Sequence, residues 1–101
     1  MRPRGGAAQA WVYILRCGDG SLYTGWSVDP QRRLERHRAG TASRYTASRQ
    51  PVDLALTLPM RDRSAAMREE ARIKRLDRAA KLELIEQHAR RGRRVAGGVA
   101  A

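Results

Sequence analysis

The sequence predicts a small α+β domain in which a three-stranded, mainly antiparallel sheet has helices packed against it, in the order β-β-α-β-α-α. Two segments rich in aromatic and β-branched residues flank a glycine turn, which predicts a hairpin. A third segment alternates apolar and polar residues with the period of a strand. The remaining segments have the capping residues and apolar spacing of helices. Because the chain has 101 residues, we expect one domain with one core.

The predicted hairpin consists of a strand at Trp11–Leu15, a turn at Gly18–Gly20 and a returning strand at Leu22–Trp26. A three-residue loop whose last glycine is left-handed gives a register in which Tyr13 and Tyr23 lie on the same face of the sheet. A two- or four-residue loop without a bulge would place the tyrosines on opposite faces. We therefore predict the three-residue loop.

The first helix is predicted to begin at Asp29 and Pro30, which suit the N-cap and the first helical position. It should end near Ala39, because Gly40 follows. Leu34 is its only large apolar residue. Packing would hold such a helix weakly, so we expect its charged residues to be needed where they are.

A Ser/Thr/Arg loop is predicted at residues 41–51, before a strand at Val52–Leu58. In this strand large apolar residues alternate with polar or small ones, which predicts one buried and one solvated face. Pro59 is expected to end the strand.

Two more helices are predicted after this strand. One should run from Asp62 or Ser64 to about Leu76, and Asp77 should cap the next.

The chain is strongly basic, with a formal charge of +11 from 21 Lys and Arg against 10 Asp and Glu. Arginine, which suits phosphate geometry, predominates, so we expect nucleic acid as the partner. A membrane role is not expected, because no predicted helix combines a basic face with a bulky apolar one and no apolar run is long enough to span a bilayer. Cys17 is the single cysteine, which excludes an internal disulfide and fits a cytoplasmic protein.

The domain boundaries follow from composition. Residues 1–9 are expected to be a flexible N-terminus, residues 10–89 the folded domain and residues 90–101 a basic, disordered tail. The tail would either solubilise the chain or contact phosphate, and its composition does not separate these roles.

Several motifs together resemble the GIY-YIG nuclease superfamily, in particular its small stand-alone members. Trp11-Val12-Tyr13 stands where the family has Gly-Ile/Val-Tyr, and Tyr23-Thr24-Gly25 stands where it has Tyr-Ile/Val-Gly. Arg33 follows Tyr23 by ten positions, as the catalytic arginine of the family does, and His37 comes one helical turn later, where the family carries Tyr or His.

Two downstream motifs extend the resemblance to about residues 11–86. Arg44-Tyr45-Thr46 precedes the third strand, as in the family, and the run Arg68–Lys74 resembles the family's R-E-x-x-I-K helix with its metal-binding glutamate. Helical periodicity does not separate Glu69 from Glu70, and the resemblance favours Glu70.

The resemblance implies that residues 10–89 form a GIY-YIG nuclease domain, a divalent-metal-dependent endonuclease that hydrolyses phosphodiester bonds of DNA. It implies that Glu70 holds one Mg²⁺ or Mn²⁺ ion, that Arg33 binds the scissile phosphate, and that one of the tyrosines orients or deprotonates the attacking water. Because a tyrosine with its ordinary pKa of about 10 is a poor base at neutral pH, it needs a nearby cation. The implied catalytic residues are Tyr13, Tyr23, Arg33, His37 and Glu70, and the implied nucleic-acid-binding residues are Trp26, Arg36, Arg44, Tyr45 and Lys74.

The chain departs from the family pattern at two tryptophans. Trp11 replaces the first glycine, and Trp26 stands where some relatives carry a lysine that would assist the base. Trp26 would either stack on an exposed base or belong to the core.

Two other functions compete with the nuclease. One is a non-catalytic nucleic-acid-binding module that keeps the fold, and the other is a helix-turn-helix reader built from the last two predicted helices. A protein partner that supplies specificity is compatible with so small a domain.

Overall fold

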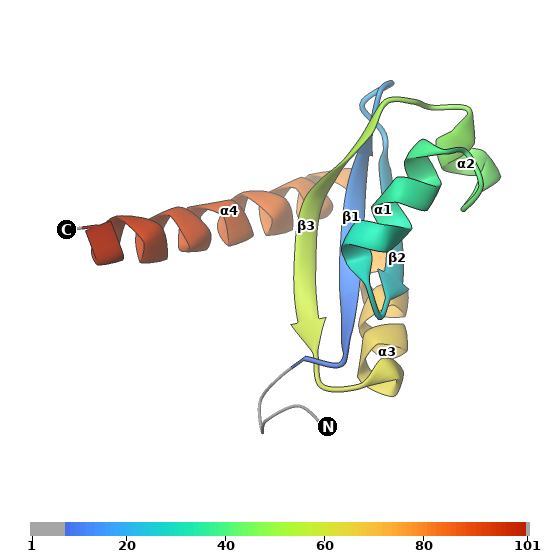
Figure 1. Cartoon of the computed structure of the whole chain (residues 1–101). Helices are drawn as coiled ribbons and strands as arrows, with labels where there is room; N and C mark the ends of the chain where they lie inside the picture. Colours follow the sequence, from blue (N-terminus) through green and yellow to red (C-terminus); the bar gives the residue numbers. More distant parts are fainter. Residues whose placement is uncertain (1–7, 101) are drawn as a thin grey trace.

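The structure is a computed structural model that describes the backbone of residues 8–100 and the side chains of residues 8–91. Its elements in chain order are β1 (Ala10–Cys17), β2 (Leu22–Ser27), α1 (Pro30–Arg38), α2 (Arg44–Ala47), β3 (Val52–Met60), α3 (Arg63–Lys74) and α4 (Arg78–Ala100). This confirms the predicted α+β class and element order, with α2 as an additional short helix (Figure 1). Most of the predicted flexible N-terminus, residues 1–7, lies outside the described residues.

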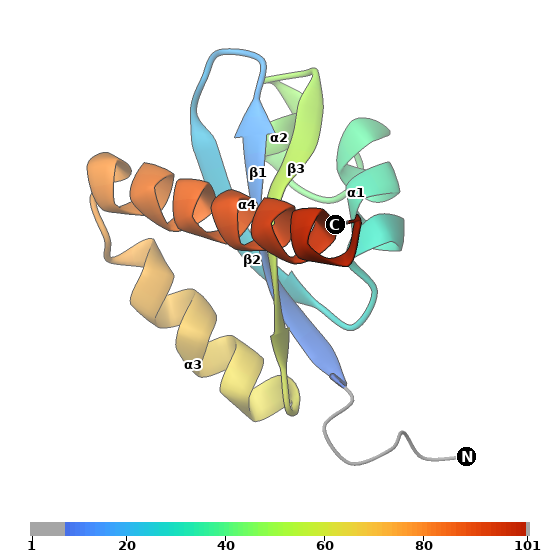
Figure 2. The same cartoon turned by 90° about the vertical axis from the view of Figure 1, so that its left-hand side faces the viewer.

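The sheet has β1 at its centre. The strand order is β2-β1-β3, and β1 pairs antiparallel with both neighbours. Figure 2 shows the sheet between α3 on one side and α1 with α2 on the other. Both faces of the sheet are therefore covered by helices.

The β1–β2 hairpin has the predicted three-residue loop. The backbone N–H of Cys17 donates to the carbonyl of Ser21 at 2.9 Å, and Gly20 has a φ of +85°. The resulting register makes Tyr13 and Tyr23 diagonal neighbours on one face of the sheet. The predicted convergence of the two tyrosines is confirmed.

The pairing of β1 with β3 contains a β-bulge, which the sequence analysis did not predict. Val52 and Leu54 pack with Tyr13 on the α1 side of the sheet, whereas Leu56 and Leu58 pack on the opposite side. The prediction of one buried and one solvated face is therefore wrong. An extra residue in one strand reverses the alternation beyond it, so the apolar residues of β3 serve both faces.

The third strand also continues past its predicted end, through Pro59 to Met60. Because β3 is an edge strand, a proline without a backbone N–H is tolerated there. Arg38 at the end of α1 donates to the carbonyl of Val52 at 3.1 Å and pairs with Asp53 at 2.7 Å. These contacts tie α1 to the start of β3.

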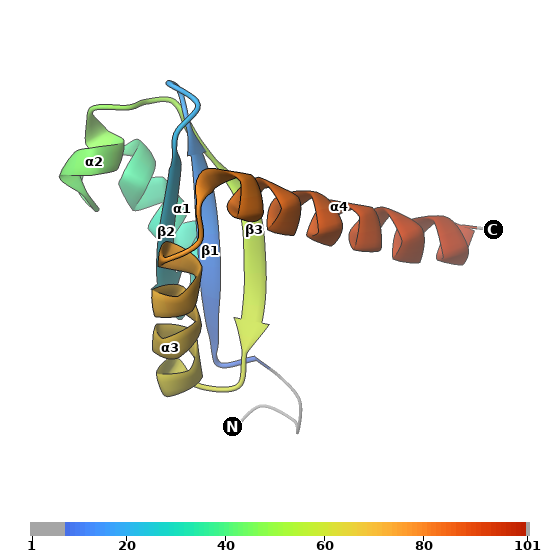
Figure 3. The same ribbon diagram turned by 180° about the vertical axis from the view of Figure 1, so that it is seen from behind.

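Two apolar clusters lie on the two faces of the sheet. The cluster beneath α3 and α4 consists of Ala10, Val12, Ile14, Leu56, Ala66, Ile73 and Ile85. The cluster beneath α1 consists of Tyr13, Leu15, Cys17, Leu34 and Val52. Figure 3 shows α3 and α4 on the side where the first cluster lies.

The helix caps predicted at Asp29 and Asp77 are confirmed, and Asp62 caps α3, whose start was left open between Asp62 and Ser64. The side chains of Asp29, Asp62 and Asp77 each accept a hydrogen bond from the backbone N–H three residues later, at 3.1, 2.8 and 2.9 Å. The short helix α2 lies within the segment expected to be a loop. It begins where the Ser43 side chain accepts from the backbone N–H of Thr46 at 3.3 Å.

The last helix, α4, extends to Ala100, so the segment predicted as a disordered tail is helical in the structure up to that residue. Arginine and alanine favour helix, and the helix passes through Gly97 and Gly98 although glycine does not. Side chains beyond residue 91 lie outside the described part of the chain. None of the described helices is both long and apolar enough to cross a bilayer.

Candidate active site

Three buried side chains form a hydrogen-bonded row on the α1 face of the sheet. The phenol oxygen of Tyr13 lies 2.9 Å from Nε2 of His37, and Nδ1 of His37 lies 2.7 Å from the hydroxyl of Thr46. These side chains come from β1, α1 and α2 and are 2%, 1% and 0% exposed. A histidine that is bonded at both ring nitrogens is held in one orientation.

Gly25 makes room for the Tyr13 ring. It lies opposite Tyr13 in the hairpin, and a Cβ atom at this position would lie 2.6 Å from both Cζ and Oη of the tyrosine. Real Cβ atoms do not approach other atoms so closely, so only glycine fits without movement. The third residue of the Tyr23-Thr24-Gly25 motif therefore allows the phenol to lie across β2.

Groups from two helices act on the Tyr13 phenol. Burial raises the pKa of Tyr13 from 10.0 to about 12, against a hydrogen bond from Arg33 that lowers it. The neighbouring Tyr23 and the carboxylate of Glu70 also raise the Tyr13 pKa. Tyr13 is consequently a neutral phenol at pH 7, with Arg33 and Glu70 both within electrostatic reach.

The pKa of His37 is shifted in the opposite direction from that of Tyr13. Burial, followed by the positive charges of Arg33 and Arg36, lowers the pKa of His37 below its ordinary value of 6.5. The imidazole is therefore uncharged at pH 7, with a free lone pair on one nitrogen.

An aromatic cluster continues from this row to the surface. The ring of Tyr23 stands edge-on to His37 with centroids 5.1 Å apart, and lies 5.9 Å from the ring of Tyr45. Tyr45 is 37% exposed, and the guanidinium of Arg49 lies 3.8 Å from its ring centroid. An exposed tyrosine backed by an arginine can stack on a base.

The structure separates the two glutamates of α3. Glu69 is held in a two-point ion pair with Arg72, with both N–O distances at 2.8 Å. Glu70 has a looser ion pair with Lys74 at 3.7 Å, and it is the glutamate that affects the pKa of Tyr13. Of the two glutamates, Glu70 is therefore the one whose charge acts on the Tyr13 phenol.

Arg33 borders two open hollows beside the row. The larger, of about 320 Å³, is lined by Trp26, Ser27, Val28, Arg33 and Arg63. The smaller, of about 130 Å³, is lined by Ser27, Val28, Asp29, Arg32, Arg33 and Arg36. The arginines in both linings suit a polyanion.

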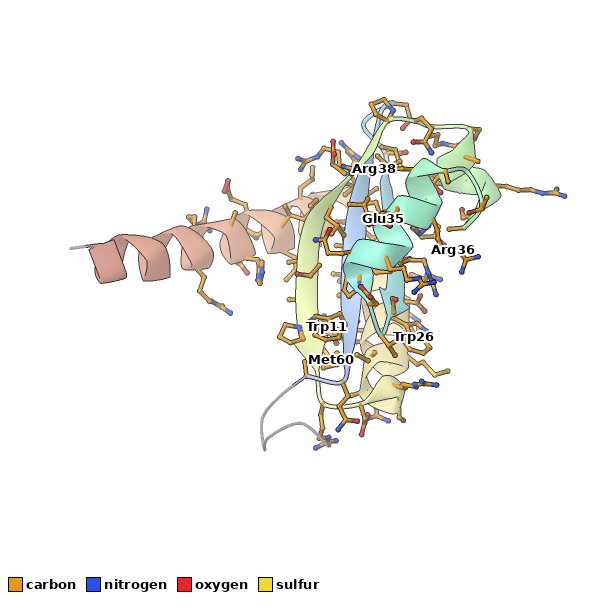
Figure 4. The ribbon with its side chains drawn as sticks, viewed as in Figure 1. Trp11, Trp26, Glu35, Arg36, Arg38 and Met60 are labelled. Carbon is orange, nitrogen blue, oxygen red and sulfur yellow. The ribbon has the colours of Figure 1, made fainter. Side chains whose placement is uncertain are left out.

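The predicted nucleic-acid-binding residues occupy different environments. Trp26 is partly buried against the cluster beneath α3 and α4, while Arg36 is exposed on α1 (Figure 4). Arg44 is exposed at the first residue of α2. Lys74 is paired with Glu70.

Thr46 is the residue of the row to which the sequence analysis gave no role. It was visible only as the last residue of the Arg44-Tyr45-Thr46 motif. Its proximity to His37, nine positions earlier, depends on how α2 folds back on α1.

Comparisons with known proteins show one family. The chain matches the GIY-YIG catalytic domain over residues 9–83. It is 46% identical over 79 residues to a UPF0213 protein of Streptococcus sanguinis, covering 78% of this chain and 91% of the relative. A UPF0213 protein of Halobacterium salinarum is 49% identical over 74 residues, covering 73% of this chain and 96% of the relative.

Two solved structures are also similar. One is the solution NMR structure of a UPF0213 protein from Bacillus halodurans, with a TM-score of 0.51 and 40% identity over 77% of this chain and 83% of that one. The other is a protein from E. faecalis, with a TM-score of 0.52 and 35% identity over 78% of this chain and 85% of that one.

Proposed function

This chain belongs to the GIY-YIG catalytic domain family, which indicates a nuclease-type activity, and from this premise we propose that it is a divalent-metal-dependent endonuclease that hydrolyses phosphodiester bonds of DNA. The observation that carries the proposal is the buried Tyr13–His37 pair, with Arg33 and Glu70 both near enough to shift the Tyr13 pKa. A domain that only binds nucleic acid has no need of a carboxylate and a buried phenol beside a phosphate-binding arginine.

The phosphate is bound by Arg33 in this proposal. The Arg33 side chain borders both arginine-lined hollows, and its charge lowers the pKa of the Tyr13 phenol. A guanidinium at this point holds a phosphoryl oxygen next to the phenol and stabilises the negative charge that develops during attack.

The attacking water is oriented by Tyr13. The sequence analysis left open which tyrosine serves as the base, and the hydrogen bond to His37 supports Tyr13. Tyr23 packs between His37 and Tyr45 and shapes the opening of the site.

The metal ion expected for the family is one Mg²⁺ or Mn²⁺, and Glu70 fits it. A carboxylate is the hard oxygen ligand that these ions prefer, and the Glu70 side chain is 20% exposed. Among the described residues there is no group of three His, Cys, Asp or Glu side chains that could hold an ion, so most ligands would be water and phosphate. When bound, the ion supplies positive charge to the phosphoryl oxygens.

Exposed side chains would guide the strand to this site. Arg36, Arg44 and the Tyr45 ring face solvent around the row, while Lys74 is placed to contact phosphate once an ion replaces it at Glu70. Trp26 borders the larger hollow and also packs, partly buried, against the apolar cluster beneath α3 and α4.

A cleavage assay tests the proposal. Labelled single-stranded, duplex and branched DNA would be incubated with the wild type, Glu70→Gln and Arg33→Ala in Mg²⁺ or Mn²⁺, and DNA binding would be measured for each. We expect both substitutions to reduce cleavage by about 100-fold or more. Glu69→Gln is the matched control on the same helix and should cleave like the wild type.

Cleavage that survives in Glu70→Gln would contradict the assigned metal ligand. Absence of cleavage on every substrate, with binding intact, would instead support a non-catalytic nucleic-acid-binding module.

A further inference from the structure

The direction of each hydrogen bond in the buried row follows from counting protons. The Thr46 hydroxyl has one proton, which it donates to the carbonyl of Ser43 at 3.3 Å. A carbonyl can only accept, so Thr46 is the donor in that bond and the acceptor from Nδ1–H of His37, 2.7 Å away. An uncharged imidazole has a single N–H, and Nε2 therefore presents its lone pair to Tyr13.

The other end of the row agrees with this direction. The positive charge of Arg33 favours lone pairs of the Tyr13 oxygen on its side, so the phenol directs its proton at Nε2 of His37. In the reverse direction, Nε2–H would donate to the phenol, and the phenol proton would lose its acceptor in the row. The assigned direction gives every proton of the row an acceptor.

The short helix α2 holds Thr46 in place. Ser43 caps this helix, and the side-chain amide of Gln50 donates to the carbonyl of His37 at 2.7 Å and to that of Thr46 at 3.0 Å. One side chain thus joins α1 to α2 at the two residues that share the hydrogen bond.

We propose that Thr46 is a positioning residue that keeps His37 in the Nδ1–H form, so that Nε2 accepts the Tyr13 proton while the phenol oxygen accepts a proton from the attacking water. This inference rests on the proposed nuclease function. An O–H bond of water breaks as one forms on Tyr13, and the phenol O–H breaks as N–H forms on Nε2. The hydroxide forms a new P–O bond as the bond from phosphorus to the departing oxygen breaks, and the departing oxygen takes a proton from solvent water. The imidazolium keeps its bond to Thr46.

We call this coupled transfer of protons, from water to Tyr13 and from Tyr13 to His37, the relay. It removes a difficulty with tyrosine as the base. A phenol that stays protonated at neutral pH cannot accept a second proton unless it releases its own in the same step. His37 provides the acceptor, and the proton returns to water through Tyr13 after the product leaves.

The groups that face His37 are compatible with its role as the acceptor of the Tyr13 proton. They are Tyr13 from β1, Tyr23 from β2, Arg33 and Arg36 from α1, and Thr46 from α2. The two arginines oppose a charged imidazole at rest, and the negative phosphate would offset them when substrate binds.

Nitrogen NMR of the imidazole rings tests the inference without a substrate. Full-length protein labelled with ¹⁵N at histidine would be recorded above pH 7 as wild type, Thr46→Val and Thr46→Ser, with His88→Gln used to assign the two histidines. We expect the Nδ1–H form of His37 in the wild type and Thr46→Ser, and a shift toward Nε2–H in Thr46→Val. An Nε2–H form in the wild type, or an unchanged ring in Thr46→Val, would overturn the inference.

A kinetic comparison tests the relay. Thr46→Val should lower kcat by about 10- to 100-fold, within the range that a positioned acid–base group contributes, and leave KM unchanged. Thr46→Ser should restore kcat to within about threefold of the wild type, since it keeps the hydroxyl. Thr24→Val is the matched control, because Thr24 is another buried threonine on the opposite face of the sheet and should cleave like the wild type.

The two experiments separate the inference from the proposed function. Equal kcat in Thr46→Val and the wild type would refute the relay while the nuclease stands. If the wild type cuts no substrate, the relay fails together with the proposed function, and the spectra alone decide whether Thr46 holds His37.

Discussion

The two faces of the sheet are built from alternate residues of the same strands, yet they bury different chemistry. On the side of α3 and α4, β1 contributes Val12 and Ile14 to an apolar cluster. On the side of α1, it contributes Tyr13, which is bonded to His37. Helices cover both faces, and among the residues that the structure describes only the α1 face buries a hydrogen-bonded row.

The difference shows how a small domain combines stability with a site. A buried polar group costs free energy unless it has a partner, and on the α1 face Tyr13, His37 and Thr46 are partners for one another. On the α3 face, the Thr24 hydroxyl is the one buried side-chain polar atom without a partner among the described residues. We therefore expect substitutions in the apolar cluster beneath α3 and α4 to change stability, and those in the hydrogen-bonded row to change chemistry as well.

The largest effect on the free energy of unfolding is expected for Ile73→Ala. Ile73 is fully buried on α3, and truncating such a residue leaves a cavity that costs about 2–5 kcal/mol. Urea denaturation measures the loss, and cleavage per folded molecule should not change. A loss below about 1 kcal/mol would contradict the close packing of Ile73 in the cluster beneath α3 and α4.

Gly25→Ala should have the next largest effect, and it should reduce both the stability of the fold and the cleavage activity. The added Cβ would overlap the Tyr13 ring, which costs about 1–3 kcal/mol in a packed interior and moves the phenol away from His37. Gly20→Ala is the control, because it strains a left-handed turn by roughly 1–2 kcal/mol but has no atom within 4 Å of its new Cβ. Cleavage should be lost in the first variant and kept in the second.

The pH dependence of stability should come from the α1 face. The pKa of His37 is lowered on folding, so its contribution is complete above about pH 6.5 and is lost as the pH falls through the folded-state pKa. The pKa of Tyr13 is raised to about 12, so its contribution is complete below pH 10 and is lost as the pH rises toward 12. Stability should therefore fall at both extremes.

Melting temperatures across pH test this difference between the faces. His37→Gln should flatten the acid side of the profile, whereas Ile73→Val should lower the melting temperature by a similar amount at every pH. An equal acid slope in the wild type and His37→Gln would contradict the lowered His37 pKa.

The smallest expected effect is a gain in the stability of the fold. Thr24→Val replaces an unpartnered buried hydroxyl with a methyl group of similar shape, and it should stabilise the fold by about 1 kcal/mol. Thermal unfolding measures the gain. A loss of stability would mean that the Thr24 hydroxyl has a partner in solution, such as a buried water.

Several parts of this molecule were predictable because local chemistry specifies them. Asp29, Asp62 and Asp77 cap their helices through bonds that span three residues, and the loop ending at Gly20 sets the hairpin register. The side of the sheet shared by Tyr13 and Tyr23 follows from that loop alone.

Other parts were not predictable because they depend on long-range packing. The bulge in β3 arises where two strands far apart in the sequence pair, and it moves Val52 and Leu54 to the α1 side against a clean alternating pattern. The folding of α2 against α1, which brings Thr46 to His37, was hidden in a segment that reads as a loop.

Charge, the caps of α1 and α4 and the hairpin register were therefore available from the order of residues, since each depends on neighbours along the chain. The candidate site residues were named by motifs. The different environments of Glu69 and Glu70, the phenol–imidazole bond and the opposite pKa shifts of Tyr13 and His37 depend on tertiary structure. The physical reason is that burial and contact between side chains 24 positions apart exist only once the helices close over the sheet.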